Sequence, residues 1–157
     1  MTLLVILSFL IWVWLLTMRG QFWRAGPILP AAVPSRTPPV AVVVPARDEA
    51  PVIERSLRSL LNQNYPGQFR ITLVDDQGKD GTGMLARSIG DSRLTVLTGT
   101  ARPAGWAGKL WAVSQGVTAA GAPEYFFLTD ADIEHAPSHL SSLVAMAEHS
   151  SSHYGQW

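Results

Sequence analysis

The sequence predicts an α/β protein with a mostly parallel sheet and flanking helices, preceded by one transmembrane helix. From residue 40 onward, short β-branched or aromatic runs alternate with helix-like stretches. This pattern indicates parallel strands joined by right-handed crossovers. Six of the seven aspartates follow apolar runs. Because ligands bind beyond the carboxyl ends of the strands in such sheets, we expect these carboxylates to gather on one edge.

The first 18 residues contain no charged side chain. We expect a transmembrane anchor over residues 1–20, because a helical span needs about 20 apolar residues. The alternatives are a buried core helix and a cleaved signal peptide, although a signal peptide would want a basic residue before the apolar run. Arg19, Arg24 and Arg36 all follow the run. The positive-inside rule then predicts a single-pass protein of the cell membrane whose following domain is cytoplasmic.

Residues 21–39 are expected to form a proline-rich linker. Five prolines between positions 27 and 39 disfavour regular structure and suit a stiff spacer. The globular domain is expected over residues 40–157, with its first strand at residues 40–44. Pro45 should end that strand because proline has no N–H to donate to a ladder.

Four helices and three further strands are expected along this domain. A stripe of apolar residues at helical spacing predicts the first helix at residues 49–61. Gly90 suits a helix C-cap, and Pro137 suits the first turn of a helix. In chain order, the remaining strands are expected at residues 69–74, 93–97 and 125–129, and the remaining helices at residues 82–89, 108–120 and 137–148.

The composition excludes several classes of function. With 12 basic and 12 acidic residues the formal net charge is zero, so the sequence lacks the positive field that nucleic-acid binding uses, and no nucleic-acid partner is expected. The absence of cysteine excludes a disulfide scaffold, a thiolate metal site and a cysteine nucleophile. Any metal must therefore be held by oxygen or histidine ligands.

Asp130 and Asp132 form the strongest chemical motif, at the end of an apolar run. Two carboxylates held close together raise each other's pKa unless a cation neutralises them. Oxygen ligands suit Mg²⁺ or Mn²⁺, which proteins often hold together with substrate phosphates. The alternative is that Asp130 ends a strand and Asp132 caps a turn or a helix.

Two further polar clusters also follow predicted strands. Asp75 and Asp76 precede a turn containing glycine, where a carboxylate could accept hydrogen bonds from a ring N–H or a sugar hydroxyl. A plain polar turn leading to an N-cap at Asp80 or Thr82 is the alternative. Arg47 could contact a base or phosphates, or could pair with neighbouring carboxylates on the surface.

Two other nucleotide-binding folds are disfavoured. The first strand is followed by Pro-Ala-Arg-Asp-Glu rather than by the G-x-G-x-x-G turn of a dinucleotide-binding domain. The segment from Gly105 to Lys109 lacks the spacing, and the following Ser or Thr, of a phosphate-binding loop. A dinucleotide-dependent oxidoreductase and a phosphate-loop NTPase are therefore both poor matches.

Taken together, the segments VVVPARDEA, LVDDQGKDGT, GKLWAVSQG and FLTDAD resemble the family 2 glycosyltransferases of GT-A fold. Among these, the sequence is most similar to the hopene-associated glycosyltransferases of bacterial membranes, over residues 40–148. The resemblance implies transfer of a sugar from a UDP-linked donor to the hydroxyl group of a hopanoid, another lipid or another acceptor. It also implies a divalent metal cofactor, Mg²⁺ or Mn²⁺.

The resemblance implies roles for individual residues. Asp76 would contact the nucleotide base, and Asp130 would lie near the ribose and diphosphate. Asp132 would be the principal metal ligand, with Asp130 beside it. Lys109 would be a basic residue near the donor, or alternatively a solvent-facing residue in the first turn of its helix. The base pocket would be lined by Pro45, Ala46, Arg47 and Glu49.

The sequence departs from the family pattern at two places. Arg47 and Asp48 replace the commoner aromatic-Asn pair, which leaves the nucleotide preference open, and Ser114 stands where other members often carry Asn. In similar enzymes the catalytic base lies downstream of the paired aspartates, so here it is expected beyond Trp157, and the chain is expected to be a truncated amino-terminal fragment. A catalytically incomplete, membrane-tethered nucleotide-sugar-binding fragment and a nucleotidyltransferase remain the alternatives.

Histidine and tryptophan give weaker signals. His135 and His139 are expected to be exposed to solvent rather than to bind a metal, because Pro137 between them breaks the helical register that such a pair requires. Trp106 and Trp111 are candidates for contact with the acceptor, since aromatic faces pack against sugars.

Overall fold

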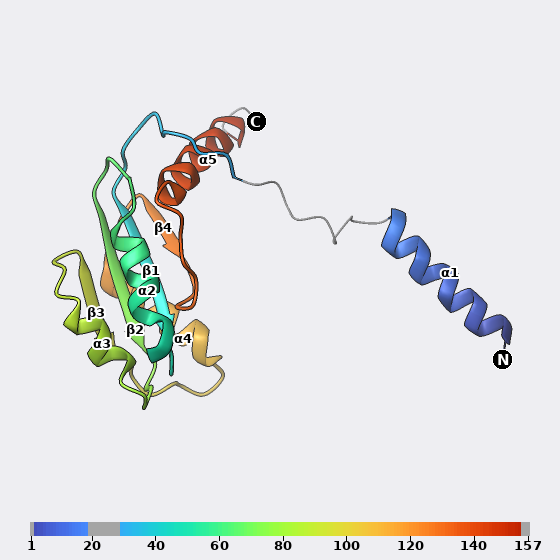
Figure 1. The fold of residues 1–157 in the computed structure, drawn as a ribbon, viewed down its shortest axis with the longest axis horizontal. Helices are drawn as coiled ribbons and strands as arrows, with labels where there is room; N and C mark the ends of the chain where they lie inside the picture. Colours follow the sequence, from blue (N-terminus) through green and yellow to red (C-terminus); the bar gives the residue numbers. More distant parts are fainter. Residues whose placement is uncertain (1, 19–28, 155–157) are drawn as a thin grey trace. The chain divides into compact units, whose positions relative to one another are not determined.

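The computed structural model describes residues 2–18 and 29–154, and the chain divides into two compact units, Met1–Pro30 and Ala31–Trp157. The first unit contains the helix α1, Thr2–Met18 (Figure 1). Its large apolar side chains are exposed. The second unit contains every other described helix and strand.

The predicted transmembrane anchor over residues 1–20 is wrong for the described part of the chain. No helix there is both long and apolar enough to cross a membrane. The helix α1 has 17 residues, and at 1.5 Å per residue it is about 25 Å long, short of a hydrocarbon core of about 30 Å. The predicted location as a single-pass protein of the cell membrane depended on that anchor and falls with it. Arg19 and Arg24, used for the orientation, lie outside the described residues.

The second unit is built on a four-stranded parallel sheet in the order β3-β2-β1-β4 (Figure 1). The predicted α/β fold with a parallel sheet is therefore confirmed. The strands are β1, Val40–Ala46; β2, Phe69–Asp75; β3, Leu94–Thr98; and β4, Tyr125–Leu128.

Four helices accompany the sheet: α2, Ala50–Leu61; α3, Thr82–Ser88; α4, Gly108–Ala120; and α5, His139–Tyr154. The prediction that Pro137 opens the last helix is wrong. The carbonyl oxygen of Pro137 accepts a hydrogen bond from the backbone N–H of Asn64 at 2.7 Å. This contact with a distant segment holds Pro137 in the loop, and α5 begins two residues later.

Pro45 does not end the first strand, as the sequence had suggested, but lies within β1. The carbonyl of Val43 accepts a hydrogen bond from Thr129, on the β4 side, and the carbonyl of Ala46 accepts one from Asp76, on the β2 side. Because successive residues of a strand face opposite neighbours, the nitrogen of Pro45 faces the β4 side. The pairing with β4 stops at Leu128 opposite Val43, so the missing N–H of Pro45 falls where the β4 ladder ends.

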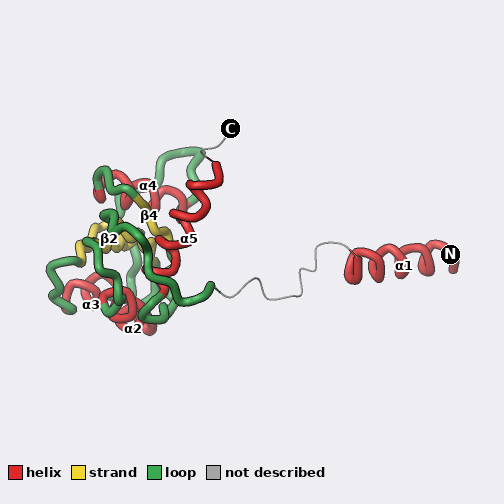
Figure 2. Tube along the Cα trace, turned by 90° about the horizontal axis from the view of Figure 1, so that it is seen from above, coloured by secondary structure: helices red, strands yellow, loops and turns green. Residues whose placement is uncertain are grey.

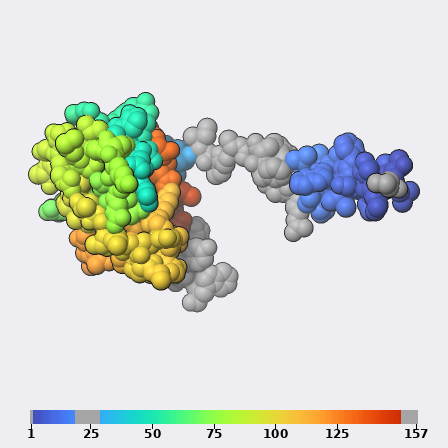
Figure 3. Space-filling view, turned by 90° about the horizontal axis from the view of Figure 1, so that it is seen from below, coloured from blue at the N-terminus to red at the C-terminus, as the bar shows by residue number. Residues whose placement is uncertain are grey.

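The central strand β1 is covered on both faces. On one face, Val42 belongs to a buried apolar cluster that includes Leu57 of α2 and Leu140 of α5. On the other face, Val43 lies against Gly116 of α4. Figure 2 shows α4 and the pair α2 and α3 on opposite sides of the sheet. The outer side of α4 contributes to the yellow surface in Figure 3.

The segment before β1 is attached to α5. The carboxylate of Glu148 accepts hydrogen bonds from the backbone N–H groups of Ser35 and Arg36 at 2.8 and 2.9 Å, and from the Ser35 hydroxyl at 2.8 Å. The backbone N–H of Ala32 donates to the Ser142 hydroxyl at 3.1 Å. Residues 29–39 form no helix or strand. These hydrogen bonds nevertheless hold the segment from residue 32 to residue 36 against α5.

The close approach of α4 to the sheet predicts a steric effect at Gly116. A Cβ at this position would clash with Cγ1 of Val43 and lie 3.1 Å from Cγ2 of Val74. We expect Gly116→Ala to lower the free energy of unfolding by about 1–3 kcal/mol, the usual effect of overpacking a core. Thermal or urea unfolding measures the change.

Gly108→Ala is the matched control in the same helix. The nearest atom to its new Cβ would be a carboxylate oxygen of Asp76 at 3.5 Å, an ordinary contact. A Gly116→Ala variant as stable as Gly108→Ala would contradict the close packing of α4 on β1.

Candidate functional site

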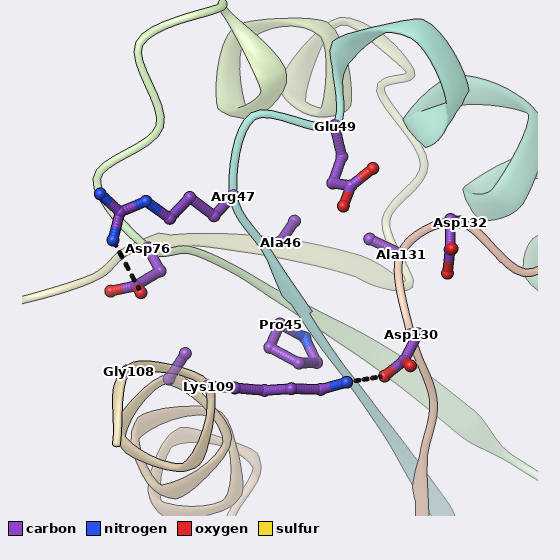
Figure 4. A pocket seen from close by; sticks show the side chains of 11 residues that line it. Pro45, Ala46, Arg47, Glu49, Asp76, Gly108, Lys109, Asp130, Ala131 and Asp132 are labelled. Carbon is purple, nitrogen blue, oxygen red and sulfur yellow. Dashed lines mark ion pairs between the residues drawn. The ribbon is translucent and has the colours of Figure 1, made fainter. Parts of the chain in front are cut away.

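A pocket of about 410 Å³ opens where β1, β2 and β4 end (Figure 4). We call it the strand-end pocket. It contains all eight residues to which the sequence resemblance gives a role in binding donor or metal. The residues that line it are Pro45, Ala46, Arg47, Glu49, Asp76, Gly108, Lys109, Ala112, Asp130, Ala131 and Asp132.

Parallel pairing explains why these residues meet. The register of β1 with β2 continues to Ala46 opposite Asp75. One residue further on, the backbone N–H of Asp76 donates to the carbonyl of Ala46 at 2.8 Å. On the other side of β1, the N–H of Thr129 donates to the carbonyl of Val43 at 3.2 Å. Both contacts extend the sheet beyond its strands and bring the residues that follow to the same edge.

An ion pair crosses the pocket between α4 and the loop after β4. Nζ of Lys109 lies 2.6 Å from Oδ1 of Asp130, and the two side chains are 63% and 48% exposed. Asp132 also lines the pocket, and no hydrogen bond or ion pair joins its side chain to another described residue. The loop after β4 thus presents one paired and one unpaired carboxylate.

This arrangement limits how the chain could hold a metal. Within residues 2–18 and 29–154, no group of three or more His, Asp or Glu side chains is placed to bind a metal ion. Asp130 and Asp132 supply two carboxylates; Asp130 is paired with Lys109, and Asp132 has no cationic partner among the residues that the structure describes. This donor set fits Mg²⁺ or Mn²⁺ where oxygens of a bound phosphate complete the coordination, as in many magnesium sites.

On the opposite side of the pocket, Arg47 lies over Asp76 (Figure 4). Its guanidinium is 3.9 Å from the carboxylate of Asp76 and also 3.9 Å from that of Asp48. The Asp76 side chain is only 13% exposed, whereas Arg47 is 65% exposed. Asp76 is therefore a mostly buried part of the pocket lining, whereas the Arg47 side chain is largely in solvent.

Hydrogen bonds fasten the loop after β1 to the loop after β2. Oδ1 of Asp48 accepts the N–H of Lys79 at 2.7 Å, and Oδ2 of Asp80 accepts the N–H of Ala50 at 2.7 Å. The hydroxyl of Thr82 accepts the N–H of Glu49 at 2.9 Å. Sequence reasoning treated Asp80 and Thr82 only as local caps, because their partners are distant in the sequence.

The prediction that both histidines are exposed to solvent is wrong for His135. His135 is buried, and its Nε2 lies 3.0 Å from the hydroxyl of Thr129. Burial, and then the nearby ring of His139, lower the pKa of His135. Both rings pack near Phe127 and line a second hollow of about 430 Å³.

The two candidate acceptor tryptophans lie together and do not line the strand-end pocket. Their ring centroids are 5.2 Å apart in an edge-to-face arrangement. Nε1 of Trp111 donates to the carbonyl of Thr100 at 3.2 Å, and Trp106 is exposed. Neither residue lines the pocket, and contact with an acceptor remains a prediction.

The motifs that line the pocket fall in a segment with recognisable relatives. Residues 41–154 match the family described as glycosyl transferase family 2. The chain belongs to glycosyl transferase family 2. This finding confirms the family resemblance drawn from the four motif segments.

Two solved structures are similar to this chain. The mannosyltransferase PcManGT from Pyrobaculum calidifontis, in complex with GDP-Man and Mn²⁺, is 30% identical, has a TM-score of 0.61, and matches 87% of this chain and 39% of its own. TarS 1–349 from S. aureus is 22% identical with a TM-score of 0.57, and matches 70% of this chain and 32% of its own. At that identity TarS supports the fold alone.

A curated relative is much longer than this chain. The uncharacterized protein y4gI of Sinorhizobium fredii is 27% identical over 115 residues, which are 71% of this chain and 12% of that protein. The chain therefore spans well under half the length of both y4gI and the mannosyltransferase.

The hydrogen bonds of Asp80 predict a contribution to stability that depends on pH. The side-chain hydrogen bond from Thr82, followed by the backbone N–H of Ala50, lowers the pKa of Asp80 below its usual value of 3.8. Its stabilising effect is complete above that value and is lost as the pH falls through the lower folded pKa. As the pH falls from about 5 to about 3, we expect the free energy of unfolding to decrease less in Asp80→Asn than in the wild type.

Thermal melts followed by circular dichroism at several pH values measure this difference. Asp132→Asn is the control, because the Asp132 carboxylate has no hydrogen bond to another described residue that protonation could remove. Parallel losses of stability in the wild type and Asp80→Asn would show that Asp80 contributes nothing to the acid sensitivity.

Proposed function

We propose that the second unit of this chain binds the donor in a glycosyltransferase reaction, in which a sugar passes from a nucleoside-diphosphate carrier to an acceptor hydroxyl in the presence of a divalent metal. The main support is the convergence of Asp76, Lys109, Asp130 and Asp132 on one pocket at the carboxyl edge of a parallel sheet. The mannosyltransferase that is 30% identical was solved with GDP-Man and Mn²⁺, which favours the same ligand class here.

The donor would lie across the pocket from Arg47 to Asp132. Asp76, mostly buried and acceptor-only when ionised, would take an N–H of the base. The exposed guanidinium of Arg47, which makes only long 3.9 Å ion pairs with Asp48 and Asp76, would turn to contact the base or a phosphate. Lys109 and the amino end of α4 would face the diphosphate, because helix amino termini favour anions.

Asp132, with Asp130 beside it, would hold the divalent cation together with phosphate oxygens. A bound Mg²⁺ or Mn²⁺ would supply positive charge that stabilises the departing diphosphate. In the transfer itself, the acceptor oxygen bonds to the anomeric carbon, the bond from that carbon to the diphosphate oxygen breaks, and the nucleoside diphosphate leaves with the electron pair. The acceptor proton passes to a base for which no residue of this chain is proposed.

We also propose the chemical class of the donor and of the acceptor. A UDP-linked sugar and a hopanoid or other lipid hydroxyl are supported by the sequence resemblance, whereas the 30% identical structure contains GDP-Man. Both UDP and GDP therefore belong in the binding assay. Tight binding of a nucleoside triphosphate instead would favour a nucleotidyltransferase.

The unpaired carboxylate of Asp132 predicts a specific loss on mutation. We expect Asp132→Ala to weaken the Mn²⁺-dependent binding of UDP or GDP by about tenfold or more, as expected when an ionic ligand contact is lost. Binding without metal should change little. Isothermal titration calorimetry with and without Mn²⁺ measures both quantities.

Glu134→Ala is the matched control. Glu134 is two residues away, forms an ion pair with Arg55 at 3.4 Å and does not line the strand-end pocket. Metal-dependent binding that survives Asp132→Ala unchanged would refute the proposed metal site.

A further inference from the structure

The strand-end pocket contains a cation of its own. The Lys109 ammonium, on the first turn of α4, contacts Oδ1 of Asp130 at 2.6 Å across the pocket (Figure 4). Both side chains are about half exposed or more, and exposed ion pairs are weak and readily broken. The pair can therefore open when a ligand offers each partner a better contact.

The ammonium and a divalent cation would compete for the same carboxylate. A divalent cation held by Asp130 and Asp132 would lie within a few ångströms of the ammonium, even if the two cations used different oxygens of Asp130. Like charges this close repel strongly in a partly enclosed pocket. Metal binding to the ligand-free pocket must therefore displace Lys109 and lose its contact with Asp130.

A diphosphate would give the displaced lysine a new partner. Lys109 and Gly108 both line the pocket at the amino end of α4. That end has no side-chain cap, since Ala107 precedes the helix and no side-chain hydrogen bond serves its first N–H groups. Uncapped helical N–H groups next to an ammonium make a favourable environment for phosphate oxygens.

We propose that Lys109 is an exchangeable counter-ion, which neutralises Asp130 in the empty pocket and moves to the diphosphate when a divalent cation takes its place. The inference rests on the proposed function and adds a coupling to it. Metal alone binds at the expense of the ion pair between Lys109 and Asp130. When a nucleoside diphosphate binds as well, Lys109 pairs with the diphosphate while the metal pairs with Asp130. The binding of each ligand therefore favours the binding of the other.

The test compares Mn²⁺ alone with Mn²⁺ plus UDP or GDP in Lys109→Met. Removing the competing ammonium should tighten the binding of Mn²⁺ alone by about two- to fivefold, the usual strength of an exposed ion pair. The same change should weaken nucleoside diphosphate binding in the presence of Mn²⁺ by about tenfold, because a charged contact to phosphate is lost. Electron paramagnetic resonance of free Mn²⁺ measures the first value, and calorimetry the second.

Two further variants separate exchange from a general effect of charge or folding. Lys109→Arg keeps a positive charge at the same position and should therefore not show the tighter binding of Mn²⁺ alone that Lys109→Met shows. Lys79→Met removes the other lysine of the sequence, which does not line the pocket, and should leave both affinities unchanged. Opposite shifts of the two affinities are specific to exchange, since a damaged fold would weaken both.

These measurements distinguish a failure of the Lys109 exchange from a failure of the proposed function. Unchanged or weaker binding of Mn²⁺ alone by Lys109→Met, in a protein whose wild type binds UDP or GDP with Mn²⁺, would overturn the exchange and leave the proposed function standing. A wild type that binds neither nucleotide in the presence of Mn²⁺ would overturn the proposed function, and the exchange with it.

Discussion

The parallel pairing of β1 with β2 on one side and β4 on the other is the constraint from which the candidate site follows. Parallel strands end on the same edge, so the residues after β2 and after β4 lie together although they are far apart in the sequence. The backbone contacts from Asp76 to Ala46 and from Thr129 to Val43 carry this pairing past the strand ends. Without these contacts, the loops after β2 and β4 would not be fixed to the end of β1.

Charge is the second organising feature of the pocket. Asp76 and Asp130 each face a basic side chain, Arg47 and Lys109 respectively, whereas Asp132 faces none in the described chain. With two of its four carboxylates already paired with a basic side chain, the pocket avoids part of the repulsion that four bare acids would create. It also provides two exposed basic side chains for an anionic ligand, one on each side.

Much of this site could be predicted because its residues follow directly from local patterns. Strand-length apolar runs locate the carboxyl edge, and the polar residues after them, such as Asp76 and Asp132, are then expected there. Features set by distant partners could not be predicted. The burial of His135 depends on Thr129 and Phe127, and the place of Pro45 within β1 depends on where β4 stops. The composition of residues 1–18 suggested a transmembrane helix, but the 17-residue length of α1 is too short for one.

A crystal structure of the protein with Mn²⁺ and either UDP or GDP would test the account most directly. The account predicts the base beside Asp76, the diphosphate against Lys109 and the amino end of α4, and Mn²⁺ on Asp132. A nucleotide bound outside the strand-end pocket, for example in the hollow beside His135 and His139, would contradict it. So would Mn²⁺ bound with the nucleotide but away from Asp132.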